Sequence, residues 1–240
     1  HTIKANKLDK LDIDLLLVGY AGAGPYPQCF IFENEDEKMK AAKAKEQQFL
    51  KHAVEYISLV KPTHFAPFAG TYTLGSRLAK LTDYRGVPSV SYATEFLNQT
   101  VTEASEGIHL EQFDTYDCES GAVTKSRKKI DLSREQYVVE ISREALDYDN
   151  DNWDDEELVD LIEQAYRRFN SKAEEIEFTS TTKLVVRSDN IAFQLGTNSQ
   201  VEIIPIDSKL VEPYVRIDVD HNLLHRLLRG PRYAHWNNAE

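Results

Sequence analysis

The sequence predicts an α/β unit followed by an α+β unit with an antiparallel sheet. The apolar run Ile13–Val18 ends at a glycine-rich turn, which is typical of a buried strand in an α/β sheet. Strand-like and helix-like segments then alternate as far as residue 106. From residue 107 onward, one strongly amphipathic helix precedes alternating runs separated by turn residues. The expected units are therefore residues 1–106 and 107–240.

In the first unit, a long helix is expected from Met39 to Val60, and it ends at Lys61-Pro62 because proline cannot continue a helix. A strand over 63–70 closes in a tight turn. A shorter helix over 74–82 and an extended piece over 87–90 follow. This rhythm predicts a parallel or mixed sheet covered by helices.

In the second unit, residues 109–116 alternate like a strand, and Asp154–Lys172 has the apolar stripe of an amphipathic helix. A further strand is expected at Tyr214–Val219, and Asp220 is expected to cap a helix over His221–Leu228. The antiparallel meander consists of three runs: 182–187, 191–195 and 200–205.

Charge and hydropathy exclude several classes of protein. The formal net charge is −12, which argues against a nucleic-acid partner because a phosphate backbone requires a basic face. The single basic cluster, 125–129, is short and typical of a solvated loop. No apolar stretch approaches the ~20 residues of a membrane helix. The opening residues lack the apolar core of a signal peptide, so we expect a cytoplasmic protein.

Two turns are the first candidate for a binding site. Segments 19–30 and 67–72 both follow predicted parallel strands, and ligands gather beyond the carboxyl ends of such strands. Glycines there permit close backbone approach, and aromatic rings can form walls. The alternative is ordinary turn chemistry with the aromatic rings in the core. The candidate substrate-binding residues are Tyr20, Gly22, Tyr26, Phe68, Gly70 and Tyr72.

Histidines are the second candidate. His221 and His225 have the i, i+4 spacing that can chelate a metal, but Asn222 stands where a zinc protease has glutamate. A pair of solvated histidines is the commoner arrangement. His64 begins the strand that leads into the second turn, and we take it as a candidate metal ligand, with a packing role as the alternative.

Calcium is the third candidate. Asp147, Asp149 and Asp151 match the first positions of an EF-hand loop, but Asn152 occupies the glycine position and Leu158 the bidentate glutamate position. The run also precedes a helix, where the dipole favours carboxylates. A solvated helix cap is therefore the preferred interpretation.

The segments 12–22 and 61–70 together resemble the later half of a metallo-β-lactamase-fold protein, in the branch that contains CMP-N-acetylneuraminate hydroxylase. The turns Gly19–Pro27 and Pro67–Gly70 carry the resemblance, which covers about the first hundred residues. It implies the second half of an αββα sandwich. Ala69 stands where most members place a last metal-binding histidine, which argues against ordinary dinuclear zinc hydrolysis.

The resemblance also implies a function for a larger protein. An N-terminal half, as a separate chain or a missing segment, would supply most metal ligands for zinc or iron. The whole would be a metal-dependent hydrolase or oxygenase-like enzyme acting on a sugar- or nucleotide-linked small molecule, and this chain would contribute walls of the pocket.

The second unit resembles sterol-carrier-like domains in its order of helix, meander, strand and short helix. Such domains can enclose an apolar cavity. The alternative function is therefore a non-catalytic binding module for an apolar or lipid-like ligand, and a cavity between the 154–172 helix and the meander is the discriminating feature. A third alternative is a domain that only mediates assembly, and a homo-oligomer stays open.

Overall fold

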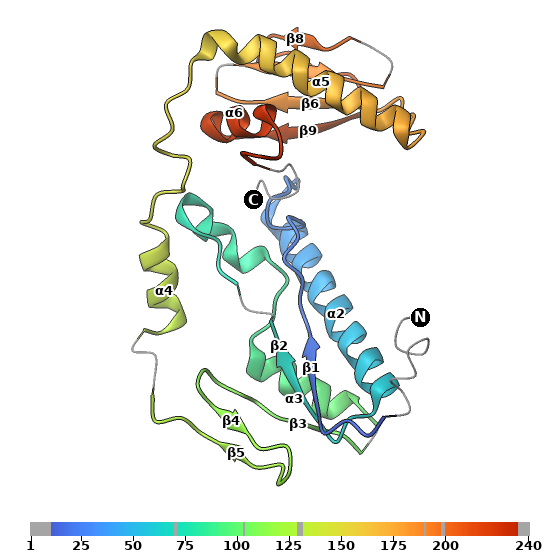
Figure 1. Ribbon diagram of the computed structural model, residues 1–240, viewed down its shortest axis with the longest axis vertical. Helices are drawn as coiled ribbons and strands as arrows, with labels where there is room; N and C mark the ends of the chain where they lie inside the picture. The colour runs from blue at the N-terminus through green and yellow to red at the C-terminus, as the bar shows by residue number, and fades with distance from the viewer. Residues whose placement is uncertain are drawn as a thin grey trace. The chain divides into compact units, whose positions relative to one another are not determined.

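The computed structural model describes residues 11–69, 72–102, 104–128, 132–189, 191–197 and 200–234. The chain divides into two compact units, His1–Glu144 and Ala145–Glu240, and each contains helices and a sheet (Figure 1). The mixed α/β class expected from the sequence is confirmed. The boundary lies later than the expected residue 106, because the strand at Glu106–Gly107 pairs within the first sheet and holds the following residues to the first unit.

The first unit is built on a parallel sheet. Its strands β1 (Leu15–Gly19), β2 (His64–Phe68) and β3 (Glu106–Gly107) lie in the order β1-β2-β3. Gly19 pairs with Phe68 in register, so β1 and β2 end at the same edge of the sheet. The two turns singled out from the sequence therefore leave from neighbouring points.

Helix α2 (Glu35–Val60) begins four residues earlier than the expected Met39. Its start is set by Asn34, whose side chain accepts a hydrogen bond from the Glu37 amide at 2.9 Å, and by the acidic first turn. The apolar face of α2 packs in a core with the sheet and the next helix; that core consists of Val18, Tyr20, Leu50, Ala53, Ile57, Phe65, Ala93 and Leu97.

The local structure of the first unit differs from the expected elements in three places. The extended piece expected at 87–90 ends at Ser89, which caps the unanticipated helix α3 (Val90–Thr100). The shorter helix expected over 74–82 is present as the 3-10 helix η2 (Ser76–Tyr84). The strand expected over 109–116 is reduced to β4 (Thr115–Tyr116), which pairs with β5 (Val123–Thr124). Helix α4 (Arg134–Ile141), which begins with a Ser133–Gln136 capping box, was not anticipated.

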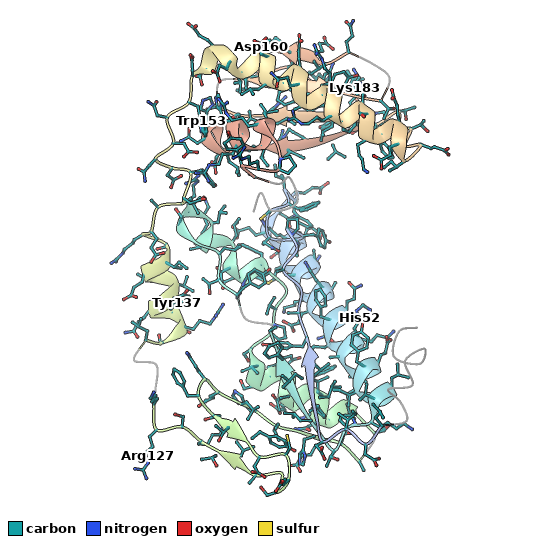
Figure 2. All side chains as sticks on the ribbon, viewed as in Figure 1. His52, Arg127, Tyr137, Trp153, Asp160 and Lys183 are labelled. Atoms are coloured by element: carbon teal, nitrogen blue, oxygen red, sulfur yellow. The ribbon has the colours of Figure 1, made fainter. Side chains whose placement is uncertain are left out.

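The second unit packs two helices on one face of a four-stranded sheet. The 3-10 turn η3 (Asp155–Glu157) leads into α5 (Leu158–Glu175), and α6 (His221–Arg229) closes the unit. Charged residues such as Asp160 lie on the exposed side of α5 (Figure 2). Both helices share one core with the sheet, formed by Leu158, Leu161, Ile162, Val186, Phe193, Leu195, Leu224 and Leu228.

The sheet itself is mixed, which corrects the expected antiparallel arrangement. Its order is β8-β7-β6-β9. The meander of β6 (Lys183–Arg187), β7 (Ala192–Leu195) and β8 (Glu202–Ile204) is antiparallel as expected. Strand β9 (Tyr214–Asp218) instead pairs parallel to β6, because the chain crosses from one edge of the sheet to the other after β8.

No helix in the described part of the chain is both long and apolar enough to cross a bilayer.

Candidate functional site

The residues expected to line a pocket beyond β1 and β2 have different environments. Tyr20 is only 1% exposed and belongs to the core of the first unit. Gly22 lies so close to α2 that a Cβ there would come within 2.6 Å of the Phe49 ring. Tyr26 and Phe68 are exposed, and Tyr26 packs edge-on against Phe30 at 5.1 Å between ring centroids. Gly70 lies outside the described residues.

Tyr72 is the member of this set that gathers polar groups. Its hydroxyl oxygen lies 3.3 Å from Nε2 of Gln28, a fully buried side chain that also donates to the Gly24 carbonyl at 2.6 Å. Its backbone carbonyl accepts from Nη2 of Arg134 at 2.9 Å, and the Arg85 guanidinium lies 5.1 Å from its ring centroid. Four side chains from distant parts of the first unit thus converge at the carboxyl edge of the sheet.

Arg85 is buried, with 6% exposure, although it carries a charge. Its Nε donates to the Thr82 carbonyl at 2.5 Å, while Nη1 has no partner among the described residues. Burial, followed by the nearby charge of Arg134, lowers the pKa of the Arg85 guanidinium. A buried cation with an unmatched donor is costly unless an anion joins it. Neither arginine was predicted as a site residue, because no local sequence pattern distinguishes them from surface arginines.

Among the described residues, His64 has two polar neighbours and belongs to no group of potential metal ligands. Its Nδ1 lies 2.8 Å from the Tyr116 hydroxyl, and its Nε2 lies 3.9 Å from a Glu106 carboxylate oxygen. The β4–β5 hairpin covers its ring, since a Cβ on Gly121 would lie 3.3 Å from its Cε1. The geometry corresponds to the packing role that the sequence left as the alternative.

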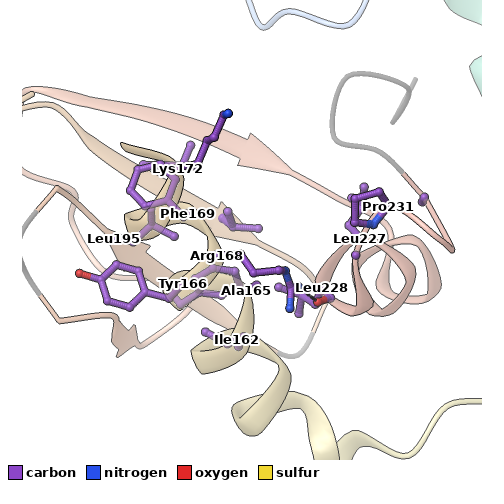
Figure 3. A pocket seen from close by; sticks show the side chains of 15 residues that line it. Ile162, Ala165, Tyr166, Arg168, Phe169, Lys172, Leu195, Leu227, Leu228 and Pro231 are labelled. Carbon is purple, nitrogen blue, oxygen red and sulfur yellow. Dashed lines mark hydrogen bonds between the residues drawn. The ribbon is translucent and has the colours of Figure 1, made fainter. Parts of the chain in front are cut away.

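The second unit contains a cavity of about 460 Å³ between α5, the sheet and α6 (Figure 3). A cavity at this location is the feature expected of a binding module for an apolar ligand. The apolar part of the lining comprises Ile162, Ala165, Tyr166 and Phe169 from α5, Leu184, Val186, Phe193 and Leu195 from the sheet, Leu227 and Leu228 from α6, and Gly230, Pro231 and Ala234 beyond it.

The charged groups of this cavity are both basic. Arg168 and Lys172 line it together with the apolar residues, and none of the described acidic residues does. Arg168 extends toward α6, where its Nη2 donates to the Leu228 carbonyl, whereas Lys172 extends outward (Figure 3) and pairs with Glu175 at 2.7 Å. In a chain with a net charge of −12, this local excess of positive charge is a distinct feature.

A cluster of potential metal ligands lies elsewhere in the second unit. His221 and His225 project from one face of α6, and both meet Asp155 of η3: Oδ1 of Asp155 is 2.7 Å from Nε2 of His221 and 3.2 Å from Nε2 of His225. It is the one group of three or more such ligands within the described ranges. His225 is fully buried and Asp155 is exposed. Hydrogen bonds from both rings lower the pKa of Asp155, and burial lowers that of His225.

Aromatic and basic side chains surround this cluster. The Trp153 indole stacks on His225, with centroids 5.9 Å apart and planes 8° apart. The Arg229 guanidinium lies 4.4 Å from the Trp153 ring centroid and pairs with Glu157 at 2.7 Å. The two histidines are recognisable from their spacing in the sequence, but the third ligand is 66 residues from His221 and becomes a neighbour only in the folded unit.

The aspartates considered for calcium have other partners. Arg226 donates from Nε to Asp151 at 2.6 Å and from Nη1 to Asp147 at 2.6 Å. Asp149 accepts from the Leu146 amide at 2.8 Å. A guanidinium therefore occupies the position where two of these carboxylates would meet a cation, and the segment is held to α6.

Comparisons of the chain with protein-family models, with curated proteins and with solved structures found no match.

Proposed function

We propose that the second unit binds a small amphiphile with an apolar chain and an anionic head, in the cavity between α5, the sheet and α6. The observation that carries the proposal is the cavity itself: about 460 Å³, with apolar side chains from both helices and two strands. Small-molecule sites are mostly apolar and usually measure ~300–1,000 Å³. A solid core between α5 and the meander would have argued for a purely structural unit.

The apolar lining supplies the driving force. Each methylene that a ligand transfers from water into such a site contributes about 0.8 kcal/mol. Phe169, Phe193 and Leu195 offer a surface that has no hydrogen-bonding demand of its own. An alkyl chain can therefore enter without leaving a buried polar group unmatched, and this favours a lipid-like ligand over a sugar.

The basic residues select the head group. Arg168 and Lys172 are the charged residues of the lining, so an acid is favoured over an alcohol, and a cationic amphiphile is disfavoured. Lys172 is 63% exposed, so it can leave Glu175 for a ligand carboxylate at small cost.

The test is calorimetric titration of the full chain with dodecanoate and with dodecyltrimethylammonium, which share a chain and differ in charge. The expected result is saturable one-to-one binding of dodecanoate and much weaker binding of the cation. Lys172→Gln should weaken dodecanoate binding, whereas Lys183→Gln, an exposed lysine of β6 that does not line the cavity, should not. Equal binding of both amphiphiles, or of neither, would contradict the proposal.

A second candidate function belongs to the first unit, and the buried Arg85 favours it. We infer that Arg85 and Arg134, beside Tyr72, hold the anionic part of a sugar- or nucleotide-linked substrate. In the metallo-β-lactamase-like interpretation, zinc or iron would be bound mainly by a separate N-terminal half, and this edge of the sheet would orient the substrate. An anion would satisfy the unmatched Nη1 of Arg85.

Titration with cytidine monophosphate tests this candidate. Arg134→Gln should weaken nucleotide binding at least ten-fold, because it removes one of the two cations proposed to hold the phosphate. Arg134 is exposed and donates one hydrogen bond to the Tyr72 carbonyl, so the change should leave the fold intact. Arg127→Gln, an exposed arginine in the basic loop (Figure 2), is the matched control and should bind as the wild type does. Binding unchanged by Arg134→Gln would remove the candidate.

A further inference from the structure

The cluster of Asp155, His221 and His225 has the composition of a metal site. Helix α6 presents the two imidazoles on one face, because residues four apart are neighbours on a helix. Turn η3 brings the carboxylate of Asp155 to both rings. Two imidazole nitrogens and one carboxylate oxygen are ligands that Zn²⁺ accepts.

The distances between the ligand atoms approach those of a tetrahedral ion. With Zn–N and Zn–O bonds of about 2.0–2.1 Å, two ligands of a tetrahedral centre lie about 3.3 Å apart. The distance from Asp155 Oδ1 to His225 Nε2 is 3.2 Å, and that to His221 Nε2 is 2.7 Å, a hydrogen-bond length. All three atoms lie within 4.8 Å of one another. An ion would therefore require only a modest displacement, chiefly of the partly exposed His221.

We propose that Asp155, His221 and His225 bind one zinc ion, with the fourth position open to water or a ligand. The three protein ligands with one open position distinguish it from a four-ligand structural site. This inference is independent of the proposed amphiphile and rests on residues that do not line the cavity.

One ligand of the proposed zinc site is held rigidly, and another is open to solvent. His225 is fully buried and is held by its stack on Trp153, so one ligand is preorganised. Asp155 is 55% exposed, which leaves a route from solvent. The positive charge of Arg229 is offset by Glu157, and the exposed Asp154 and Glu156 add negative charge around the entrance.

The hydrogen bonding of the two histidine ligands limits the expected affinity for zinc. The Nδ1 atoms of His221 and His225 are buried and have no hydrogen-bond partner among the described residues. Metal-binding histidines usually donate that proton to a carboxylate, carbonyl or water, and the loss of such a partner weakens binding by roughly 10–100-fold. We therefore expect micromolar rather than nanomolar affinity.

The test uses the full chain, stripped of metal with a chelator and titrated with zinc chloride. One ion per chain is expected. Asp155→Asn and His221→Gln should each weaken binding at least ten-fold, while Asp160→Asn and His52→Gln, a matched aspartate and a matched histidine outside the cluster, should leave it unchanged. Circular dichroism checks that each variant is folded.

A second readout locates the ion. The chain has two tryptophans, so Trp236→Phe leaves Trp153 as the only indole. Because Trp153 stacks on His225, paramagnetic Co²⁺ in the site should quench its fluorescence, and excess Zn²⁺ should restore it. Zinc binding equal in wild type and Asp155→Asn, absence of binding, or Trp153 fluorescence indifferent to Co²⁺ would each overturn the proposal.

Discussion

The indole ring of Trp153 lies nearly parallel to the imidazole ring of His225, with 8° between the planes and 5.9 Å between the centroids. The contact links the segment before α5 to α6, two parts of the chain that the sequence separates widely. Figure 2 shows Trp153 beside α6. The stack fixes one ligand of the proposed zinc site and also contributes to the packing of the second unit.

Trp153→Ala should therefore destabilise the second unit. Full truncation of a buried tryptophan costs about 3–5 kcal/mol, and a partly exposed one such as Trp153 should cost roughly 2 kcal/mol. The free energy of unfolding is measured by urea titration followed by far-ultraviolet circular dichroism. Val215→Ala, at a side chain 55% exposed on β9, is the control and should change it by less than about 0.5 kcal/mol. Equal effects of the two variants would argue against the stack.

Arg226→Lys should destabilise the same unit. The guanidinium makes two hydrogen bonds to Asp151, from Nε at 2.6 Å and from Nη2 at 2.9 Å, and a third to Asp147. Lysine retains the charge but not the fork geometry, so a loss of about 1–2 kcal/mol is expected. Arg167→Lys, at an exposed arginine of α5, should be neutral within error in the same urea titration. A neutral Arg226→Lys would mean that charge alone matters there.

The Asp114 carboxylate should contribute to the acid sensitivity of the first unit. The hydrogen bond from Lys125, followed by those from the Ser126 and Glu111 amides, lowers the pKa of Asp114 to about 2 from its ordinary 3.8. Because the folded-state pKa is depressed, the stabilisation is fully present above pH ~3.8 and is lost as pH falls through about 2. Asp114→Asn should thus be less stable than wild type at pH 7, and urea titrations should show the difference shrinking between pH 4 and pH 2. A difference that does not change over this range would refute the assignment.

The cavity should also lower the cost, in unfolding free energy, of a larger side chain beneath α5. Insertion of bulk into a well-packed core costs about 1–3 kcal/mol. Ala165→Leu directs extra methyl groups into the space beneath α5, so its cost should fall below that range. Ala93→Leu, at a fully buried alanine in the core of the first unit, is the comparison and should cost an amount within it. Unfolding free energies from urea titration decide the matter. Equal penalties at the two positions would indicate that the space beneath α5 is filled.

The parts of the fold that were predictable depend on local patterns. The apolar stripe of α5 and the alternation in β6 and β7 identify these elements from the sequence alone. The parallel pairing of β9 with β6 was not predictable, because it depends on where the chain crosses the sheet. Helix α3 was missed although Ser89 is a good N-cap, since Val87-Pro88 favoured an extended interpretation.

The candidate sites were likewise predictable only where they depend on local sequence patterns. The spacing of His221 and His225 is visible in the sequence, but Asp155 joins them only through the packing of η3 on α6. A cavity between α5 and the meander was only the discriminating feature of the alternative function, implied by the resemblance to sterol-carrier-like domains. Its two basic residues were not anticipated, because Arg168 and Lys172 are spaced like ordinary charges on a helix. Arg85 becomes notable only through its burial.

The most direct test of amphiphile binding is to fill the cavity. Ala165→Phe places a ring in the space that the ligand would occupy, and Gln164→Phe, at the exposed neighbouring position, adds the same ring outside it. Calorimetric titration of both full-length variants with dodecanoate should show binding abolished in Ala165→Phe and retained in Gln164→Phe. Dodecanoate binding that survives in Ala165→Phe at wild-type affinity would contradict the assignment of this cavity as the ligand site.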